Sequence, residues 1–114
     1  YTTLFRSDLA VGQNRAGTRL YRNTLGRPGL RVRLEGADSN PRGVGAVIRA
    51  VFGSGPGPAR AVRAGGGYGS QDSWTQVLAT PEPPTAVRVR WPGGRQTEVP
   101  VPTGSREVRV SGLP

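Results

Sequence analysis

The chain has 114 residues, enough for one complete domain with a modest hydrophobic core but not for a second one. It contains no Cys and no His, which excludes disulfides, thiolate metal sites, zinc sites built on His or Cys, and catalysis by a His base or a Cys nucleophile. All 16 basic residues are Arg, and the formal net charge of +9 attracts polyanions at low salt.

Residues 1–7 resemble the translation of the end of a common sequencing adapter. We therefore expect an assembly artefact and a protein truncated at its N-terminus, with a coincidental native segment as the alternative. These residues do not enter the functional argument.

Two short strand patterns follow, in residues 8–14 and 18–23, around turn formers in residues 14–17. Residues 8–24 resemble the tail of a β-propeller repeat of the FG-GAP/VCBS type. The calcium loop of that family is Asp-x-Asp-x-Asp-Gly-x-x-Asp, and Asp8 matches only its last acidic position. The resemblance implies that Asp8 is a remnant ligand, because calcium needs about six to eight oxygens. No cofactor is expected in this chain, and the resemblance leaves room for calcium in the propeller before it.

Residues 25–28 predict a linker, and alternating apolar and polar residues then predict strands. In residues 30–35, Leu30, Val32 and Leu34 face inward. Residues 44–52 predict a longer strand, residues 59–64 its hairpin partner, and residues 72–79 a further strand. The longest aliphatic or glycine run, residues 44–48, is too short to span a membrane.

The strongest hairpin signal joins residues 85–91 to residues 95–101. The register that agrees with both apolar faces pairs Trp91 with Arg95, Val89 with Thr97, Val87 with Val99 and Arg88 with Glu98. Pro100 and Pro102 predict an edge strand, because proline cannot donate to a strand ladder. Residues 107–110 predict the last strand. No stretch has helical periodicity, so the expected fold is all-β, an antiparallel β-sandwich formed by residues 29–114.

Residues 64–73 are too rich in glycine for a helix or a regular strand and predict a shaped loop. A phosphate-binding loop is not expected, because the chain has no Lys and no helix is predicted after the loop.

Four motifs in order resemble the ASPIC/UnbV domain over roughly residues 29–112. They are Ser39-Asn40, Val44-Gly45-Ala46, the loop around Tyr68 to Gln71, and Trp91-Pro92-Gly93-Gly94. The resemblance implies a preceding β-propeller and export from a bacterial cell. Two positions depart from the family pattern: Gly29-Leu30 replaces Trp-Leu, and residues 76–80 replace an aromatic Phe-Gly-Leu-Gly segment.

The loop of residues 65–74 and the loop of residues 37–43 are the candidate contact surface. Tyr68, Gln71, Asp72 and Trp74 combine ring faces with amide and carboxylate groups suited to sugar hydroxyls or a protein partner, and Asn40 is the candidate in the second loop. The alternative is a structural loop in which Tyr68 packs across the sheet edge while Ser70, Gln71 and Ser73 cap backbone groups.

The sequence offers two further candidate sites, a calcium site and an arginine-rich face. Asp38 and Asp72, with Asn40, offer oxygen ligands for a hard cation such as calcium, and ordinary Asx turns are the alternative. Six outward-facing arginines could form a nucleic-acid face or a solvated sheet face: Arg31, Arg33, Arg49, Arg63, Arg88 and Arg90. The strands lack paired aromatics for base stacking, so no specific nucleic-acid partner is expected.

We expect no enzymatic activity, because the chain lacks His, Cys and Lys and only a carboxylate pair is left for acid and base chemistry. Of the seven acidic residues, only Asp38 and Asp72 could form such a pair in a cleft. The chain is interpreted as a non-catalytic C-terminal module of a secreted, periplasmic or cell-surface β-propeller protein. It would bind or brace, with its own N-terminal propeller and an extracellular glycan or protein as partners. The alternative is a carbohydrate-binding accessory module of a larger enzyme.

Overall fold

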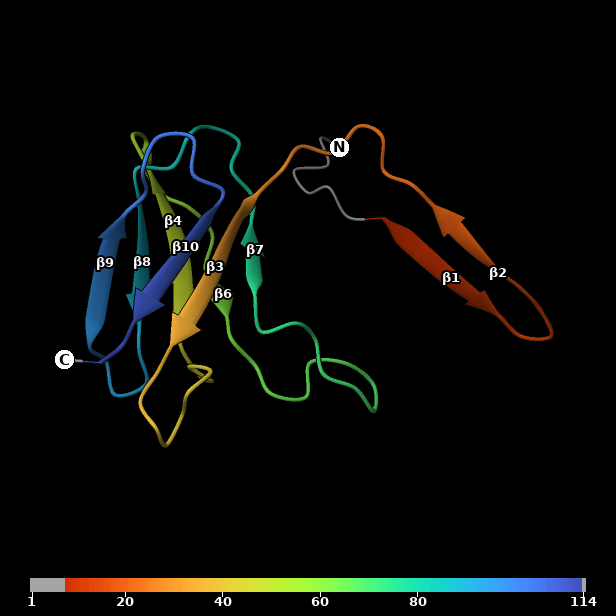
Figure 1. The fold of residues 1–114 in the computed structure, drawn as a ribbon, viewed down its shortest axis with the longest axis horizontal. Coiled ribbons are helices and arrows are strands. Elements are labelled where there is room, and N and C mark those ends of the chain that lie inside the picture. Colours follow the sequence, from red (N-terminus) through yellow and green to blue (C-terminus); the bar gives the residue numbers. More distant parts are fainter. Residues whose placement is uncertain (1–7, 114) are drawn as a thin grey trace.

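The computed structural model describes residues 8–113, which form strands and loops in three sheets (Figure 1). Residues 1–7, on which the adapter interpretation depends, lie outside the described residues. In the described range, no helix is long and apolar enough to cross a membrane. The strands are β1 (Leu9–Gln13), β2 (Ala16–Tyr21), β3 (Leu30–Glu35), β4 (Val47–Phe52), β5 (Gly55–Pro56), β6 (Arg60–Ala61), β7 (Gln76–Leu78), β8 (Ala86–Arg90), β9 (Gln96–Pro100) and β10 (Glu107–Ser111).

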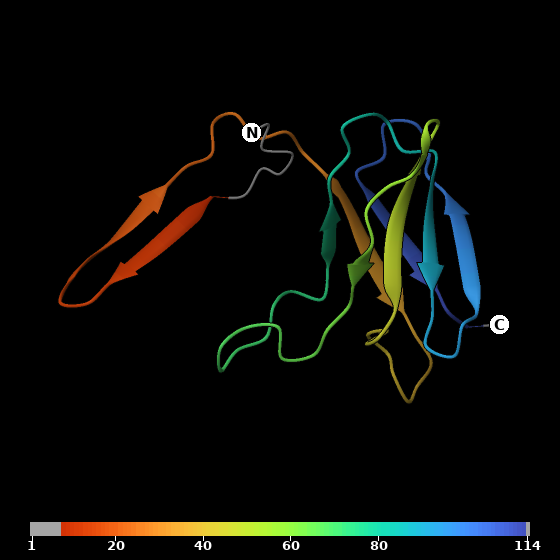
Figure 2. The same ribbon diagram turned by 180° about the vertical axis from the view of Figure 1, so that it is seen from behind.

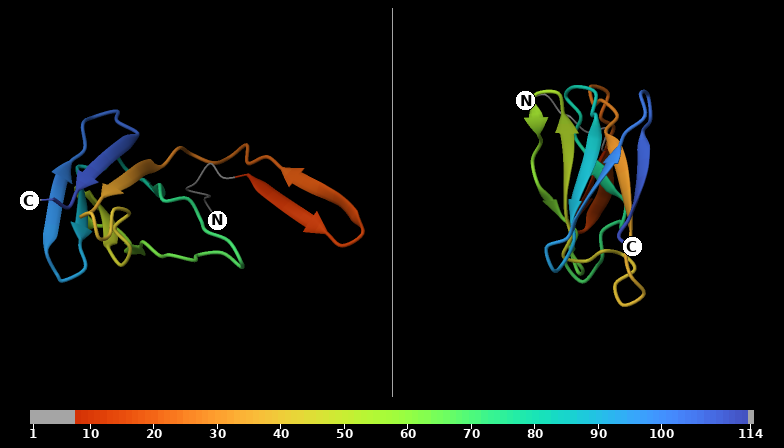
Figure 3. Two further views of the ribbon diagram at one scale, coloured as in Figure 1. Left: turned by 60° about the horizontal axis from the view of Figure 1, so that its bottom comes forward. Right: turned by 90° about the vertical axis from the view of Figure 1, so that its left-hand side faces the viewer.

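β1 and β2 form an antiparallel hairpin, as the sequence predicts, and extend away from the other two sheets (Figures 1 and 3). Arg15, in the turn, has a φ of 60°. At the other end of the hairpin, the backbone N–H of Asn23 donates to Asp8 Oδ1 at 2.8 Å. The hairpin is largely exposed, and 80% of Leu20 is accessible to solvent. None of its residues belongs to the buried core cluster.

β4 lies at the centre of a five-stranded sheet with the order β5-β4-β8-β9, and β6 pairs with the same β4 strand. The predicted β8–β9 register is confirmed, with Val89 opposite Thr97 and Arg88 opposite Glu98. The Trp91 amide donates to the Arg95 carbonyl at 2.8 Å, which closes the hairpin where expected. β9 is an edge strand, as its prolines predict.

Three expected strands are shorter in the structure, and the hairpin partner expected at residues 59–64 is a strand only at Arg60–Ala61. β4 begins at Val47 instead of residue 44, because Gly43 and Gly45 adopt φ values of 67° and 87° that are incompatible with a strand. The segment of residues 72–79 is a strand only at Gln76–Leu78. Side-chain hydrogen bonds shape its start instead, since the Thr75 amide donates to Ser73 Oγ at 3.2 Å.

The three-stranded sheet has the order β10-β3-β7 and contains one parallel pair. β7 is antiparallel to β3, whereas β10 is parallel to it, with Val108 opposite Val32 and Val110 opposite Leu34. The expectation of a purely antiparallel fold is therefore wrong for β10. Parallel strands need a long connection, and β4 to β9 lie between β3 and β10 along the chain. The chain can therefore return from β9, in the other sheet, and run along β3 in the same direction.

The two larger sheets lie one over the other as separate layers, with the core between them (Figure 3). Both sheets contribute to a single cluster of buried apolar side chains. From the three-stranded sheet these are Leu30, Val32, Leu78, Val108 and Val110, and from the five-stranded sheet Ile48, Ala50, Phe52, Val87 and Val89; Ala46, Val62 and Trp91 complete the cluster.

Trp91 is buried at one end of this core, directly after β8. Its Nε1 donates to Thr97 Oγ1 at 2.9 Å, so the ring's polar atom has a partner. Two glycines leave room for the ring. A Cβ atom added at Gly112 would lie 2.8 Å from the ring atom Cη2, and one added at Gly43 would lie 3.2 Å from Cζ3.

Because the β1–β2 hairpin contributes nothing to the core, removing residues 1–25 is expected to leave the stability of the remaining chain unchanged within about 0.5 kcal/mol. Chemical denaturation followed by tryptophan fluorescence checks this, since both tryptophans lie in the remaining part. A loss of several kcal/mol would show that the hairpin is an integral part of the fold.

Candidate functional site

The glycine-rich loop ends in a tight turn that projects from the edge of the molecule (Figure 2). Gly67 and Ser70 exchange two backbone hydrogen bonds, of 3.2 Å from the Gly67 amide and 3.4 Å from the Ser70 amide. Gly69 adopts a φ of 56°, a conformation that favours glycine. Tyr68 stands at the tip with a relative exposure of 106%. The alternative in which Tyr68 packs across the sheet edge is therefore wrong.

Gln71 holds the base of this loop together. Its Oε1 accepts a hydrogen bond from the Gly65 amide, while its Nε2 donates to the carbonyls of Arg63, at 3.2 Å, and Asp72, at 3.0 Å. One amide side chain thus connects both legs of the loop, as the capping alternative predicts. Gln71 shapes the site, and its own polar atoms are already engaged.

Between the loop and the strands β6 and β7 lies a hollow of about 600 Å³, lined mostly by polar and charged residues, which we call the loop groove. Arg60 forms its floor by joining the edges of the two sheets: its Nε donates to Gln76 Oε1 at 3.2 Å and its Nη1 to the Val77 carbonyl at 3.3 Å. Gln76 Nε2 in turn donates to the Ser73 carbonyl at 3.3 Å. The groove is lined by Arg60, Ala61, Arg63, Gly66, Gln71, Asp72, Ser73, Thr75, Gln76 and Val77.

The Asp72 carboxylate is the acidic group of the loop groove, which it shares with the two guanidinium groups of Arg60 and Arg63. It lies over Gly66, where an added Cβ atom would come within 2.7 Å of Asp72 Oδ2. Within residues 8–113 this carboxylate makes neither a hydrogen bond nor an ion pair. Its oxygens are therefore available to hydroxyl or amide donors of a ligand.

The other candidate residues lie outside this groove. Trp74 is half-buried, packs against the core and lines a separate hollow beside Arg42 and Arg109. Both ends of the Asn40 amide are used locally: Nδ2 donates to the Val44 carbonyl at 2.8 Å and Oδ1 accepts from the Val44 amide at 2.9 Å. Asn40 therefore closes the loop of residues 37–43.

Asp8, Asp38 and Asp72 do not form a common site. Within residues 8–113, no three His, Cys, Asp or Glu side chains are placed so that they could hold a metal ion. Asp38 is exposed on its loop, and Asp8 accepts the hydrogen bond from Asn23 described above. The donor set around Asp72 consists of guanidinium and amide groups, which suit hydroxyl or carboxylate ligands better than a cation.

Arg60 and Gln76 are groove residues that the sequence analysis did not identify. Both lie in short edge strands whose meeting depends on how two sheets pack, and sequence periodicity carries no signal for such a contact. The sequence signal that could have indicated them is that each is a polar residue at the start of a short strand.

A family model described as ASPIC and UnbV matches residues 36–112. The match includes the loop groove, Asn40 and Trp91. No curated protein and no solved structure matches the chain. The FG-GAP/VCBS interpretation of residues 8–24 stays a prediction.

Proposed function

Because the chain belongs to the ASPIC and UnbV family, we propose that its residues from 29 onward form a β-sandwich that acts as a non-catalytic binding or bracing module. The shared core between the two larger sheets supports the sandwich assignment. The family context, together with the resemblance of residues 8–24 to a propeller repeat, supports a place at the C-terminal side of a β-propeller in a secreted, periplasmic or cell-surface protein.

The observation that carries the proposal is the loop groove with its unengaged Asp72 carboxylate. A fully exposed Tyr68 stands on a tight turn beside it, and Gln71 fixes the loop in one shape. Such a preformed site loses little conformational entropy on binding. Exposed aromatic rings next to polar groups are typical of contact surfaces for proteins and sugars.

The hairpin β1–β2 supports the bracing part of the proposal. Leu9, Leu20 and Tyr21 are more than half exposed, and Leu25 follows them in the linker. Leu9 and Tyr21 are paired on one face of the hairpin and Leu20 lies on the other, so both faces expose apolar side chains. Exposed apolar side chains on both faces are typical of an element that other elements cover. In a propeller blade, further strands of the same repeat would cover them.

A carbohydrate-binding role is the second candidate, and the chemistry of the groove favours it. Guanidinium, amide, carboxylate and hydroxyl groups line one hollow, which suits the alternating donors and acceptors of sugar hydroxyls. This module would then serve an enzyme elsewhere in the same protein.

A glycan array probed with the full chain tests the carbohydrate role. Asp72→Asn is expected to weaken binding of a recognised glycan at least tenfold, since a hydrogen bond to a charged group contributes about 1.5–3 kcal/mol. Tyr68→Ala is also expected to weaken it, because it removes the ring face exposed beside the groove. The unfolding midpoint should stay unchanged, because both side chains are exposed. Asp38→Asn is the matched control, with the same charge change outside the groove.

Bracing predicts a different result. The module and a propeller encoded in the same gene, produced as separate polypeptides, are expected to associate, and Tyr68→Ala is expected to weaken that complex. Two results together would contradict both roles: glycan binding that is unchanged in Tyr68→Ala and Asp72→Asn, and no association between module and propeller.

A further inference from the structure

We propose that the outer face of the five-stranded sheet binds an acidic polysaccharide through Arg49, Arg88 and Arg90. This face lies outside the loop groove and shares none of its lining residues. The proposal therefore does not depend on the function proposed for the groove.

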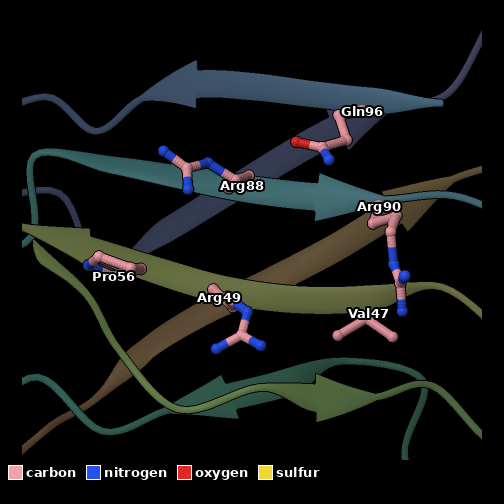
Figure 4. A pocket seen from close by; sticks show the side chains of 6 residues that line it. All are labelled: Val47, Arg49, Pro56, Arg88, Arg90 and Gln96. Carbon is pink, nitrogen blue, oxygen red and sulfur yellow. The ribbon is translucent and has the colours of Figure 1, made fainter. Parts of the chain in front are cut away.

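Strand register gathers the three arginines on one surface. Arg49 on β4 lies directly opposite Arg88 on β8, and Arg90 follows two positions along β8, so all three side chains leave the same face of the sheet. Opposite residues of antiparallel strands have Cα atoms about 4.5–5.5 Å apart, and alternate residues on one strand are about 7 Å apart. Figure 4 shows the three side chains on the near side of the β4 and β8 ribbons.

These arginines surround a shallow hollow of about 300 Å³. Val47 and Pro56 provide its apolar surface, and Gln96 adds an amide at the start of β9 (Figure 4). The hollow therefore offers aliphatic contacts for the C–H faces of sugar rings, surrounded by cationic and amide donors.

The protein balances only one of the three arginine charges on this face with a carboxylate. Arg88 Nε forms an ion pair with Glu98 Oε2 at 2.8 Å, and Glu98 is the one acidic residue in β4, β5, β6, β8 and β9. Arg49 Nη1 donates to the Gly57 carbonyl at 3.1 Å, which leaves its charge uncompensated. Arg90 has no side-chain hydrogen bond or ion pair with any residue in the range 8–113.

Arg49 and Arg88 lie directly opposite each other, where like charges repel, and the ion pair between Arg88 and Glu98 offsets this repulsion only in part. An anion placed between them removes this repulsion. Guanidinium groups bind carboxylates with two parallel hydrogen bonds, so successive uronate groups of a polysaccharide fit a row of arginines. The hollow has no aromatic residue in its lining on which a nucleic-acid base could stack, which favours the polysaccharide over single-stranded nucleic acid.

Binding of polygalacturonate to the full chain tests the proposal, with neutral dextran and a single-stranded oligodeoxynucleotide as competing probes. The double variant Arg49→Gln/Arg90→Gln is expected to weaken polygalacturonate binding at least tenfold and to keep the unfolding midpoint of the wild type. The matched control, Arg27→Gln/Arg31→Gln, removes the same charge away from this face and should weaken binding less than threefold.

Three results would overturn the proposal. The first is an equal loss in both double variants, which would mean that net charge alone attracts the polymer. The second is tighter binding of the oligodeoxynucleotide than of polygalacturonate at physiological salt. The third is no measurable binding of polygalacturonate at low salt. Asp72→Asn should leave this binding intact, so a failure at the loop groove and a failure at the arginine face are distinguishable.

Discussion

Replacing Trp91 by Ala is expected to lower the free energy of unfolding by about 3–5 kcal/mol, the range for removing a buried aromatic side chain. Trp91 is only 7% exposed and belongs to the core cluster, where it fills the space beside Gly43 and Gly112. Loss of the ring leaves a cavity that two glycines without side chains cannot fill. Urea denaturation followed by circular dichroism measures the change, and Trp74 remains as a fluorescent reporter.

Two milder variants separate the packing of the ring from its hydrogen bond. Thr97→Val removes the partner of Trp91 Nε1 at nearly constant shape and should cost about 1 kcal/mol. Trp91→Phe keeps part of the ring and should fall between the two. If Trp91→Ala costs no more than Thr97→Val, the ring does not contribute to the core as described.

The second large effect is expected at Gly112, where Gly112→Ala should cost about 1–3 kcal/mol by overpacking. A Cβ atom there would lie 2.8–2.9 Å from three atoms of the Trp91 ring, and a ring held by core contacts and a hydrogen bond cannot easily move. Gly53→Ala is the matched control. Its Cβ atom would meet nothing within 4 Å, so its effect on the free energy of unfolding should be small.

A double-mutant cycle assigns the cost to that contact. Trp91→Phe removes the outer ring atoms that a Cβ at residue 112 would approach, so Gly112→Ala should cost less than half as much when it is combined with Trp91→Phe. If Gly112→Ala lowers the free energy of unfolding equally with and without Trp91→Phe, the strain lies in the backbone of residues 111–113 and not in the contact with the ring.

The elements that could be predicted from sequence are those whose partners are close along the chain. The β8–β9 register followed from alternating residues on both sides of a Pro-Gly-Gly turn, because one register alone buries Val87 and Val89. The β1–β2 hairpin followed from similar local signals. Both depend on short-range pairing, which periodicity and turn residues determine.

The features that could not be predicted depend on contacts between distant segments. The parallel alignment of β10 with β3 leaves no trace in the alternation of Val108 and Val110, which fits either direction. The loop groove was anticipated through Asp72, but its floor at Arg60 required knowing that β6 and β7 meet at the edges of two different sheets. Packing of Tyr68 against the sheet edge was a reasonable alternative because aromatic residues are often buried, whereas a tight turn holds it in solvent.

The parallel pairing of β10 with β3 also has a consequence for how the chain is made. β3 is the central strand of its sheet and is synthesised before β4 to β9, while its neighbour β10 is synthesised after all the other strands described. Until β10 leaves the exit tunnel, one edge of β3 stays unpaired, and Leu30 and Val32 lack part of their cover. Folding is therefore completed after translation has passed residue 111, and a nascent polypeptide interrupted before that point is a substrate for chaperones or proteases.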